Sequence, residues 1–102
     1  MKFLDILRNT IYKELGVDIT ETKRDRLHAD AIKIFSHIAY AKGYTLHQIG
    51  AYTNRDHSTI VCAKKTFKDL YGYDRNFILQ ANKIIGAMDE VAFFESVGLL
   101  SY

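Results

Sequence analysis

The chain has 102 residues, of which 48% are hydrophobic and 25% charged, a balance typical of one soluble globular domain. This excludes a disordered tail, a collagen-like chain and a low-complexity linker, and the single cysteine excludes an internal disulfide framework and a multi-cysteine zinc cluster. Asp5 stands where a secretory apolar region would begin, and no apolar run approaches the roughly 18 residues that span a membrane. We therefore expect an intracellular protein of cytoplasmic localisation with no membrane segment.

The charges are unevenly distributed, although the net charge is only +2. Residues 23–68 carry nine basic and three acidic side chains, so this segment has a net charge of +6 between two acidic ends. A basic segment of this kind indicates a surface that faces a polyanion. Taken alone, it is equally compatible with a solvated face.

The apolar spacing predicts an all-α fold, a compact domain of five to six helices that spans residues 1–102. The chain has no proline and only six glycines, and both residues destabilise helix interiors. The predicted helices cover about residues 2–15, a long segment from after Thr20 or Thr22 to Gly43, and then residues 46–52, 56–71 and 75–88. Their core residues recur every three or four positions: Leu4, Leu7, Ile11, Leu15, Leu27, Ala31, Ile34, Ile38, Ala41, Ile60, Ala63, Phe67, Leu70, Phe77, Ile78, Ala81, Ile84 and Ile85.

Local signals mark a pair of helices joined by a short turn. Thr45 and Gln48 have the spacing of a capping box, which predicts the start of the helix at 46–52. Thr53 and Asn54 break that helix, and the next one begins at about Asp56. Two helices joined by about three residues follow the helix-turn-helix plan, in which the second helix enters the major groove of DNA.

The second helix of this pair begins with residues that can contact base edges. Asp56 can accept a hydrogen bond from a cytosine amino group, and His57 can donate to a base acceptor or pack on a thymine methyl group. Ser58 and Thr59 can donate or accept. Arg55 and the lysines at 64, 65 and 68 can contact phosphates. In the alternative interpretation, Asp56 only caps the helix and the lysines form a solvated face.

This region resembles the C-terminal DNA-binding domain of the bacterial replication initiator DnaA, in the stretches Leu46-His47-Gln48-Ile49-Gly50 and Arg55-Asp56-His57-Ser58-Thr59-Ile60-Val61. That family carries a leucine, two residues, Ile-Gly, a short turn and then Arg-Asp-His-Thr/Ser-Thr-Val. It binds a short asymmetric duplex site, the DnaA box, through a Trp-repressor-like helix-turn-helix. Upstream, Lys23-Arg24-Asp25-Arg26 is similar to the family's basic loop. The resemblance covers about residues 4–71, and residues 72–102 would form a helical extension.

The resemblance implies a role for each matching position. The expected base contacts are Asp56, His57, Ser58 and Thr59 in the major groove and Arg24 in the minor groove, with Lys23 as the alternative to Arg24. The expected DNA backbone contacts are Lys23, Arg26, His47, Gln48 and Arg55. Lys64 and Lys65 are added to them because they lie further along the same helix as Asp56–Thr59 and not because of the resemblance. The chain departs from the family at His47, where proline is common, and at Thr53-Asn54, which replaces a glycine pair in a turn one residue shorter.

Other functions have less support in the sequence. No GxxxxGK[ST] phosphate loop is present, so we expect no ATPase activity, and no constellation of residues indicates an enzyme. The four histidines lack partners at the spacing of metal ligands, and Cys62 is expected to be a small buried thiol beside Ile60 and Ala63. Five tyrosines offer an alternative, stacking on single-stranded bases: Tyr40, Tyr44, Tyr52, Tyr71 and Tyr73.

The tail at 91–100 is apolar and is expected to add one or two helical turns that close the core. Otherwise it forms a surface for a homodimer or another protein partner, and the chain is an interaction module with a vestigial helix-turn-helix. Our main expectation is sequence-specific binding of double-stranded DNA, at DnaA-box-like sites, in replication or transcription control. Such a stand-alone protein suits a phage or other mobile element, and it needs no cofactor and no small-molecule substrate.

Overall fold

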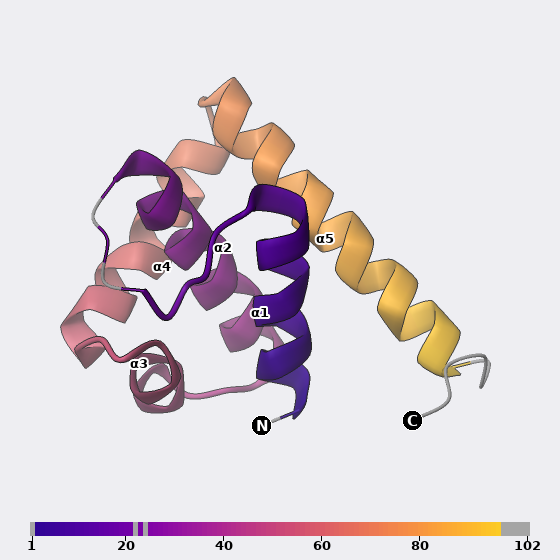
Figure 1. Cartoon of the computed structure of the whole chain (residues 1–102). Coiled ribbons are helices and arrows are strands. Elements are labelled where there is room, and N and C mark those ends of the chain that lie inside the picture. The colour runs from indigo at the N-terminus through magenta and orange to yellow at the C-terminus, as the bar shows by residue number, and fades with distance from the viewer. Residues whose placement is uncertain (1, 22, 24, 97–102) are drawn as a thin grey trace.

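The computed structural model describes residues 2–21, 23 and 25–96, with side-chain surroundings as far as Asp89. This part of the chain forms five helices and no strands: α1 (Lys2–Leu15), α2 (Arg26–Lys42), α3 (Leu46–Thr53), α4 (His57–Tyr71) and α5 (Arg75–Ser96) (Figure 1). The all-α fold predicted from the sequence is therefore confirmed. The predicted bounds are right for α1, and those of α3 differ by one residue.

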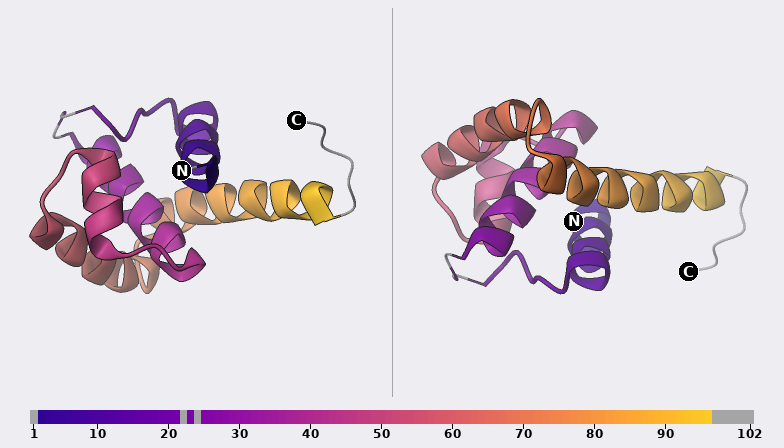
Figure 2. Two further views of the ribbon diagram at one scale, coloured as in Figure 1. Left: turned by 90° about the horizontal axis from the view of Figure 1, so that it is seen from below. Right: turned by 90° about the horizontal axis from the view of Figure 1, so that it is seen from above.

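Helix α2 is the centre of the packing. It contacts α1, α3, α4 and α5, while α3 packs on α4, and α1 and α4 each pack on α5 (Figure 1). Because α2 is covered from several sides, it buries residues around much of its circumference, including the polar side chains of Asp30 and Ser36. The α3–α4 pair packs against α2, and α4 also contacts α5, into which its last turn leads (Figure 2).

The core follows most of the predicted apolar spacing, but two of the expected residues are exposed and five are only half-buried: Leu15, Ile38, Leu70, Ile78 and Ile85. The buried apolar residues come from all five helices and from the α1–α2 loop: Leu4, Leu7, Ile11, Val17, Ile19, Ala31, Ile32, Ile34, Phe35, Ala39, Ile49, Ile60, Ala63, Phe67, Phe77, Ala81, Ile84 and Met88. Leu27, which is 37% exposed, and Ala41, which is also exposed, were expected in this core. Both expectations are wrong, because these residues of the first and last turns of α2 lie at the surface.

The start of α2 lies later in the chain than predicted. Thr20 lies in a turn before the helix, where its backbone N–H donates to Asp18 Oδ1 over 3.0 Å and the Glu21 N–H donates to the Asp18 carbonyl over 3.1 Å. The N-cap of α2 is Asp25, whose Oδ1 accepts from the backbone N–H of His28 over 2.9 Å. The helix ends as predicted at Gly43, which adopts a left-handed conformation with φ 111°.

Helix α5 is longer than predicted. Asp74 starts it by accepting a hydrogen bond from the backbone N–H of Phe77 over 3.1 Å, but the helix continues to Ser96 instead of ending near Met88. Its last turns extend past α1 and away from the other helices (Figure 2). The one or two helical turns predicted within residues 91–100 are in part the last turns of α5, which continue to Ser96. The side-chain contacts of residues 91–100, and with them the predicted closure of the core, lie outside the described part of the structure.

Candidate nucleic-acid interface

A capping box starts α3. Thr45 Oγ1 accepts from the backbone N–H of Gln48 over 3.1 Å, and Gln48 Oε1 accepts from the backbone N–H of Thr45 over 2.9 Å. This reciprocal pair satisfies two N–H groups that have no partner inside the helix. Gln48 was expected to contact the DNA backbone. Its carbonyl oxygen is used in the cap, and its exposed amide remains as a donor.

The turn between α3 and α4 has three residues and is unusually close to α3. Asn54 takes the left-handed conformation at φ 57°, and the Arg55 backbone N–H donates to the Gly50 carbonyl over 2.8 Å. A Cβ atom on Gly50 would lie 2.8 Å from the Arg55 carbonyl oxygen, closer than such atoms approach. Gly50 therefore allows the chain to return directly over α3 before α4 begins.

The first turn of α4 presents the four predicted major-groove residues at the surface. Asp56, His57, Ser58 and Thr59 are all exposed. Asp56 is the N-cap of α4, as the alternative interpretation has it, but its side chain makes no capping hydrogen bond. Its carboxylate is therefore not committed to the helix that follows.

Beyond its first turn, α4 has one side buried in the core and one side exposed to solvent. Ile60, Ala63 and Phe67 face the core, and Cys62 and Lys65 lie on the other side and are exposed. The expectation that Cys62 is buried is therefore wrong. Sequence neighbours do not share a helix face, because each residue is rotated by about 100° from the one before it.

The two predicted phosphate-contacting lysines of α4 differ in their surroundings. Lys64 is half-buried, and its Nζ lies 3.4 Å from the centre of the Tyr40 ring, a cation–π contact with α2. Lys65 is exposed. Lys65 therefore presents its charge to solvent about two turns after the start of α4, whereas Lys64 is held against the protein.

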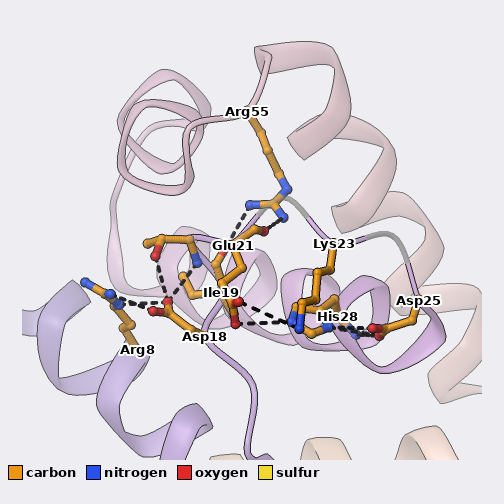
Figure 3. A network of polar contacts seen from close by, with 9 residues as sticks. Arg8, Asp18, Ile19, Glu21, Lys23, Asp25, His28 and Arg55 are labelled. Carbon is orange, nitrogen blue, oxygen red and sulfur yellow. Dashed lines mark hydrogen bonds and ion pairs between the residues drawn. The ribbon is translucent and has the colours of Figure 1, made fainter.

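Arg55 has a role that the sequence did not reveal. Its Nη1 donates to the Ile19 carbonyl oxygen over 2.6 Å, and its Nη2 donates to the Glu21 carbonyl over 2.7 Å (Figure 3). Nη1 also donates to the Thr53 carbonyl over 2.8 Å. Burial lowers the pKa of this guanidinium from its usual value. The expected phosphate contact by Arg55 stays a prediction; in the structure the side chain joins the α3–α4 turn to the α1–α2 loop, where three carbonyl groups converge.

The α1–α2 loop is also fixed to α1. Arg8 forms a two-pronged ion pair with Asp18, with N···O distances of 3.0 and 2.8 Å, and Thr20 donates to the same carboxylate (Figure 3). Hydrogen bonding from Arg8 holds the pKa of the Asp18 carboxyl well below its usual range. On the other side of Arg8, the Tyr52 hydroxyl donates to Asp5, and burial together with this contact raises the pKa of Tyr52 to about 12.

The basic loop is described only in part. Lys23 is exposed and lies 4.0 Å from the Glu21 carboxylate, whereas Arg24, the expected minor-groove contact, lies outside the described residues. Arg26 was expected to contact phosphate. Its guanidinium instead pairs with Asp74 over 2.6 Å and with Asp30 over 3.4 Å, which ties the start of α2 to the start of α5.

A groove of about 570 Å³ connects the basic loop to α4. Eight of its lining residues are polar or charged: Lys23, His28, Lys33, Asn54, Arg55, Asp56, Thr59 and Thr66. Lys33 was not among the expected site residues. In the sequence, Lys33 could have been noticed because it lies in the +6 segment. In the structure it lies one helical turn after Ala29, and both residues line this groove.

His47 and His57 bring the starts of α3 and α4 together. Their rings are stacked, with centroids 4.3 Å apart and an interplanar angle of 22°. Both side chains are exposed. The sequence placed the two residues at one interface but gave no indication of their direct contact.

Comparisons with other proteins give no further assignment. No protein-family model matches the chain, and no match is found among curated proteins or solved structures. Within the described residues, no three histidine, cysteine or acidic side chains are grouped to hold a metal ion. None of the described helices combines the length and the apolar character needed to cross a membrane.

Proposed function

We propose that the chain binds double-stranded DNA sequence-specifically, with α3 and α4 as a helix-turn-helix and the first turn of α4 in the major groove. The observation that carries this proposal is the cluster of exposed polar side chains at the start of α4, namely Asp56, His57, Ser58 and Thr59. Their donors and acceptors match those of base edges. The short turn and the close contact of α3 with α4 also support it.

Charge gives the second line of support. Lys65 on α4 and Lys23 in the basic loop are both exposed, and a groove connects their two elements. In this proposal α4 occupies the major groove while the basic loop, including Arg24, follows the adjacent minor groove. The similarity to the DnaA DNA-binding domain favours a short asymmetric site of the DnaA-box type, used in replication or transcription control without ATP hydrolysis.

A second candidate is a protein-interaction module that acts through its C-terminal segment. The last turns of α5 extend away from the other helices, and residues 91–100 are rich in apolar side chains (Figure 2). This candidate predicts self-association or partner binding that is independent of α4.

Equilibrium binding to duplexes tests the main proposal. His57→Ala and Asp56→Ala should each weaken binding to a preferred site by about 1–3 kcal/mol while leaving non-specific binding nearly unchanged. Lys65→Ala is the matched control on the same helix face, and it should weaken binding to all sequences alike and reduce the salt dependence by about one phosphate contact. Retention of full sequence preference by both α4 variants, with unchanged melting curves, would contradict the proposal.

A further inference from the structure

The chain on both sides of Lys23 is fixed to neighbouring elements of the fold. Two positions before it, the Glu21 carbonyl accepts a hydrogen bond from Arg55 of the α3–α4 turn over 2.7 Å (Figure 3). Two positions after it, the Asp25 carboxylate lies against the imidazole of His28 on α2. The segment that presents Lys23 is therefore attached at one end to the turn before α4 and at the other end to α2.

His28 lies between two carboxylates. Its Nδ1 is 2.8 Å from Asp25 Oδ1 and 3.0 Å from Oδ2, and it is the donor because a carboxylate only accepts. Its Nε2 is shielded from solvent, has no hydrogen-bond partner among the described residues, and lies 3.6 Å from the Glu21 carboxylate (Figure 3). The His28 side chain is only 9% exposed. Both acidic side chains therefore contact one buried ring of α2.

Asp25 has two distinct contacts with His28. In addition to the ring contact, its Oδ1 accepts from the His28 backbone N–H over 2.9 Å, which caps α2. Hydrogen bonds from His28 hold the pKa of the Asp25 carboxyl below its usual value. The ring contact can be removed without loss of the cap, because a serine at this position can also accept from the backbone N–H.

Lys23 is the cation whose position these contacts decide. Its side chain is 66% exposed and lines the groove of about 570 Å³ together with His28 and, from α4, Thr59. Electrostatics alone would assign Glu21 and Asp25 an unfavourable effect on DNA binding, because they place negative charge beside this lysine. Their contacts with His28 indicate the opposite effect, since a lysine that is held in place loses less conformational freedom when it binds.

We propose that Glu21, Asp25 and His28 are positioning residues for DNA binding, which hold Lys23 at a fixed distance from α4; this inference rests on the proposed function. With α4 in the major groove, Lys23 then reaches the DNA backbone without a prior search of loop conformations. The effect belongs to duplexes that α4 binds in register, because only there does a fixed distance matter. Two acidic residues of a basic surface therefore strengthen binding to the preferred site.

Dissociation constants for the preferred duplex and for an unrelated duplex test the proposal. Asp25→Ser and Glu21→Ala should each weaken binding to the preferred duplex by about three- to tenfold, although each removes a negative charge. Binding to the unrelated duplex should not weaken, because charge dominates there. Asp69→Asn, at an exposed position near the end of α4, is the matched control for charge, and it should weaken neither complex. Unchanged or tighter binding of the preferred duplex by both loop variants would overturn the proposal.

A double-variant cycle shows whether the effect acts through Lys23. Lys23→Gln should weaken binding by itself, and Asp25→Ser should add little to it, because a lysine that is absent cannot be misplaced. Glu21→Ala provides a second cycle at an exposed residue. Thermal melting of each variant sets the temperature of these measurements, so that only folded protein is compared. Fully additive effects in both cycles would overturn the positioning role.

The attachment of the segment is testable without DNA. NMR relaxation of the Lys23 backbone amide should give an order parameter of about 0.85, near that of the helices, in the wild type and a lower value in Asp25→Ser. An equally low value in both proteins would overturn the proposal at this step. If the attachment is found and the wild type binds no duplex, the proposed function is contradicted, and the role of these residues in DNA binding with it.

Discussion

Arg55 shows how one side chain can define the geometry of the candidate interface. Its three hydrogen bonds to backbone carbonyls connect the turn before α4 to the loop that leads into Lys23. The hydrogen bonds to Ile19 and Glu21 join residues that are 36 and 34 positions apart in the chain, and only the one to Thr53 is local. No local sequence pattern could therefore indicate the two distant contacts. Arg55 is thus a positioning residue that sets the distance between α4 and the basic loop.

Replacement of Arg55 should separate a positioning role from a phosphate contact. Arg55→Ala should lower the free energy of unfolding by about 2 kcal/mol, because three carbonyl groups, two of them part-buried, lose their charged donors. Arg55→Lys retains the charge but not the planar fork, so it should restore little of this stability. Urea denaturation measures both variants. Full recovery of stability and DNA affinity in Arg55→Lys would contradict the positioning role.

Gly50 is the second residue on which the α3–α4 geometry depends. Gly50→Ala should destabilise the protein by about 1–3 kcal/mol, since the added methyl group would meet the Arg55 carbonyl at 2.8 Å. Gly86→Ala on α5 is the matched control, because a Cβ atom there meets nothing within 4 Å. It should be neutral or stabilise by roughly 0.5–1 kcal/mol. Equal effects of the two substitutions in thermal melting would remove the argument for close approach.

Asp18 supplies a pH-dependent contribution to stability. Folding lowers the pKa of this carboxyl through Arg8, so its contribution is present above the unfolded pKa near 4 and is lost as the pH falls below it. Asp18→Asn should cost about 1 kcal/mol at neutral pH, a modest value because the ion pair is partly exposed to solvent.

Comparison across pH tests this role of Asp18. The difference in unfolding free energy between wild type and Asp18→Asn should shrink as the pH falls below about 4. Asp89→Asn, on the exposed part of α5, should match the wild type throughout. A difference for Asp18→Asn that stays constant down to acid pH would mean that the Arg8 ion pair contributes nothing to stability.

At the scale of the helices, the sequence predicted the bounds that depend on local interactions, namely apolar spacing and helix capping. The bounds of α1 follow from its apolar stripe, and the capping box of Thr45 and Gln48 fixes the start of α3. The exposed position of the first turn of α4 also followed from helical spacing. The start of α2 could not be predicted, because the segment from Asp18 to Glu21 is held by contacts with the distant residues Arg8 and Arg55.

The candidate site was predictable in its residue types and only partly in its arrangement. The four polar residues at the start of α4 are exposed, as a helix-turn-helix requires. The contacts of Arg26 with Asp74 and of Lys64 with Tyr40 depend on how separate helices pack. Tertiary packing therefore decides which basic side chains of the +6 segment remain available to a polyanion.

At the scale of the whole molecule, the extension of α5 is open to a direct test. The core formed by the described residues reaches from Leu4 to Met88, and the helix then continues past α1 (Figure 2). A chain shortened to residues 1–89 should therefore remain folded and lose less than about 2 kcal/mol, on the order of one buried apolar side chain. Urea denaturation and sedimentation of both chains provide the measurement.

Two other results would change this view of the C-terminal segment. Early melting or aggregation of the shortened chain would mean that residues 91–100 close the core. Loss of self-association on shortening, with folding retained, would support a partner surface in this segment. DNA affinity of the shortened chain for a single site should be unchanged in that case, because α3 and α4 are intact.

The most direct test of the central claim is selection of binding sites from a random pool of duplexes by the purified full-length protein. The account predicts enrichment of one short asymmetric sequence, bound about a thousandfold or more tightly than unrelated duplex. His57→Ala, folded by thermal melting, should lose part of that preference. Recovery of no common sequence, or a tighter binding of single strands than of duplex, would contradict sequence-specific recognition by α4.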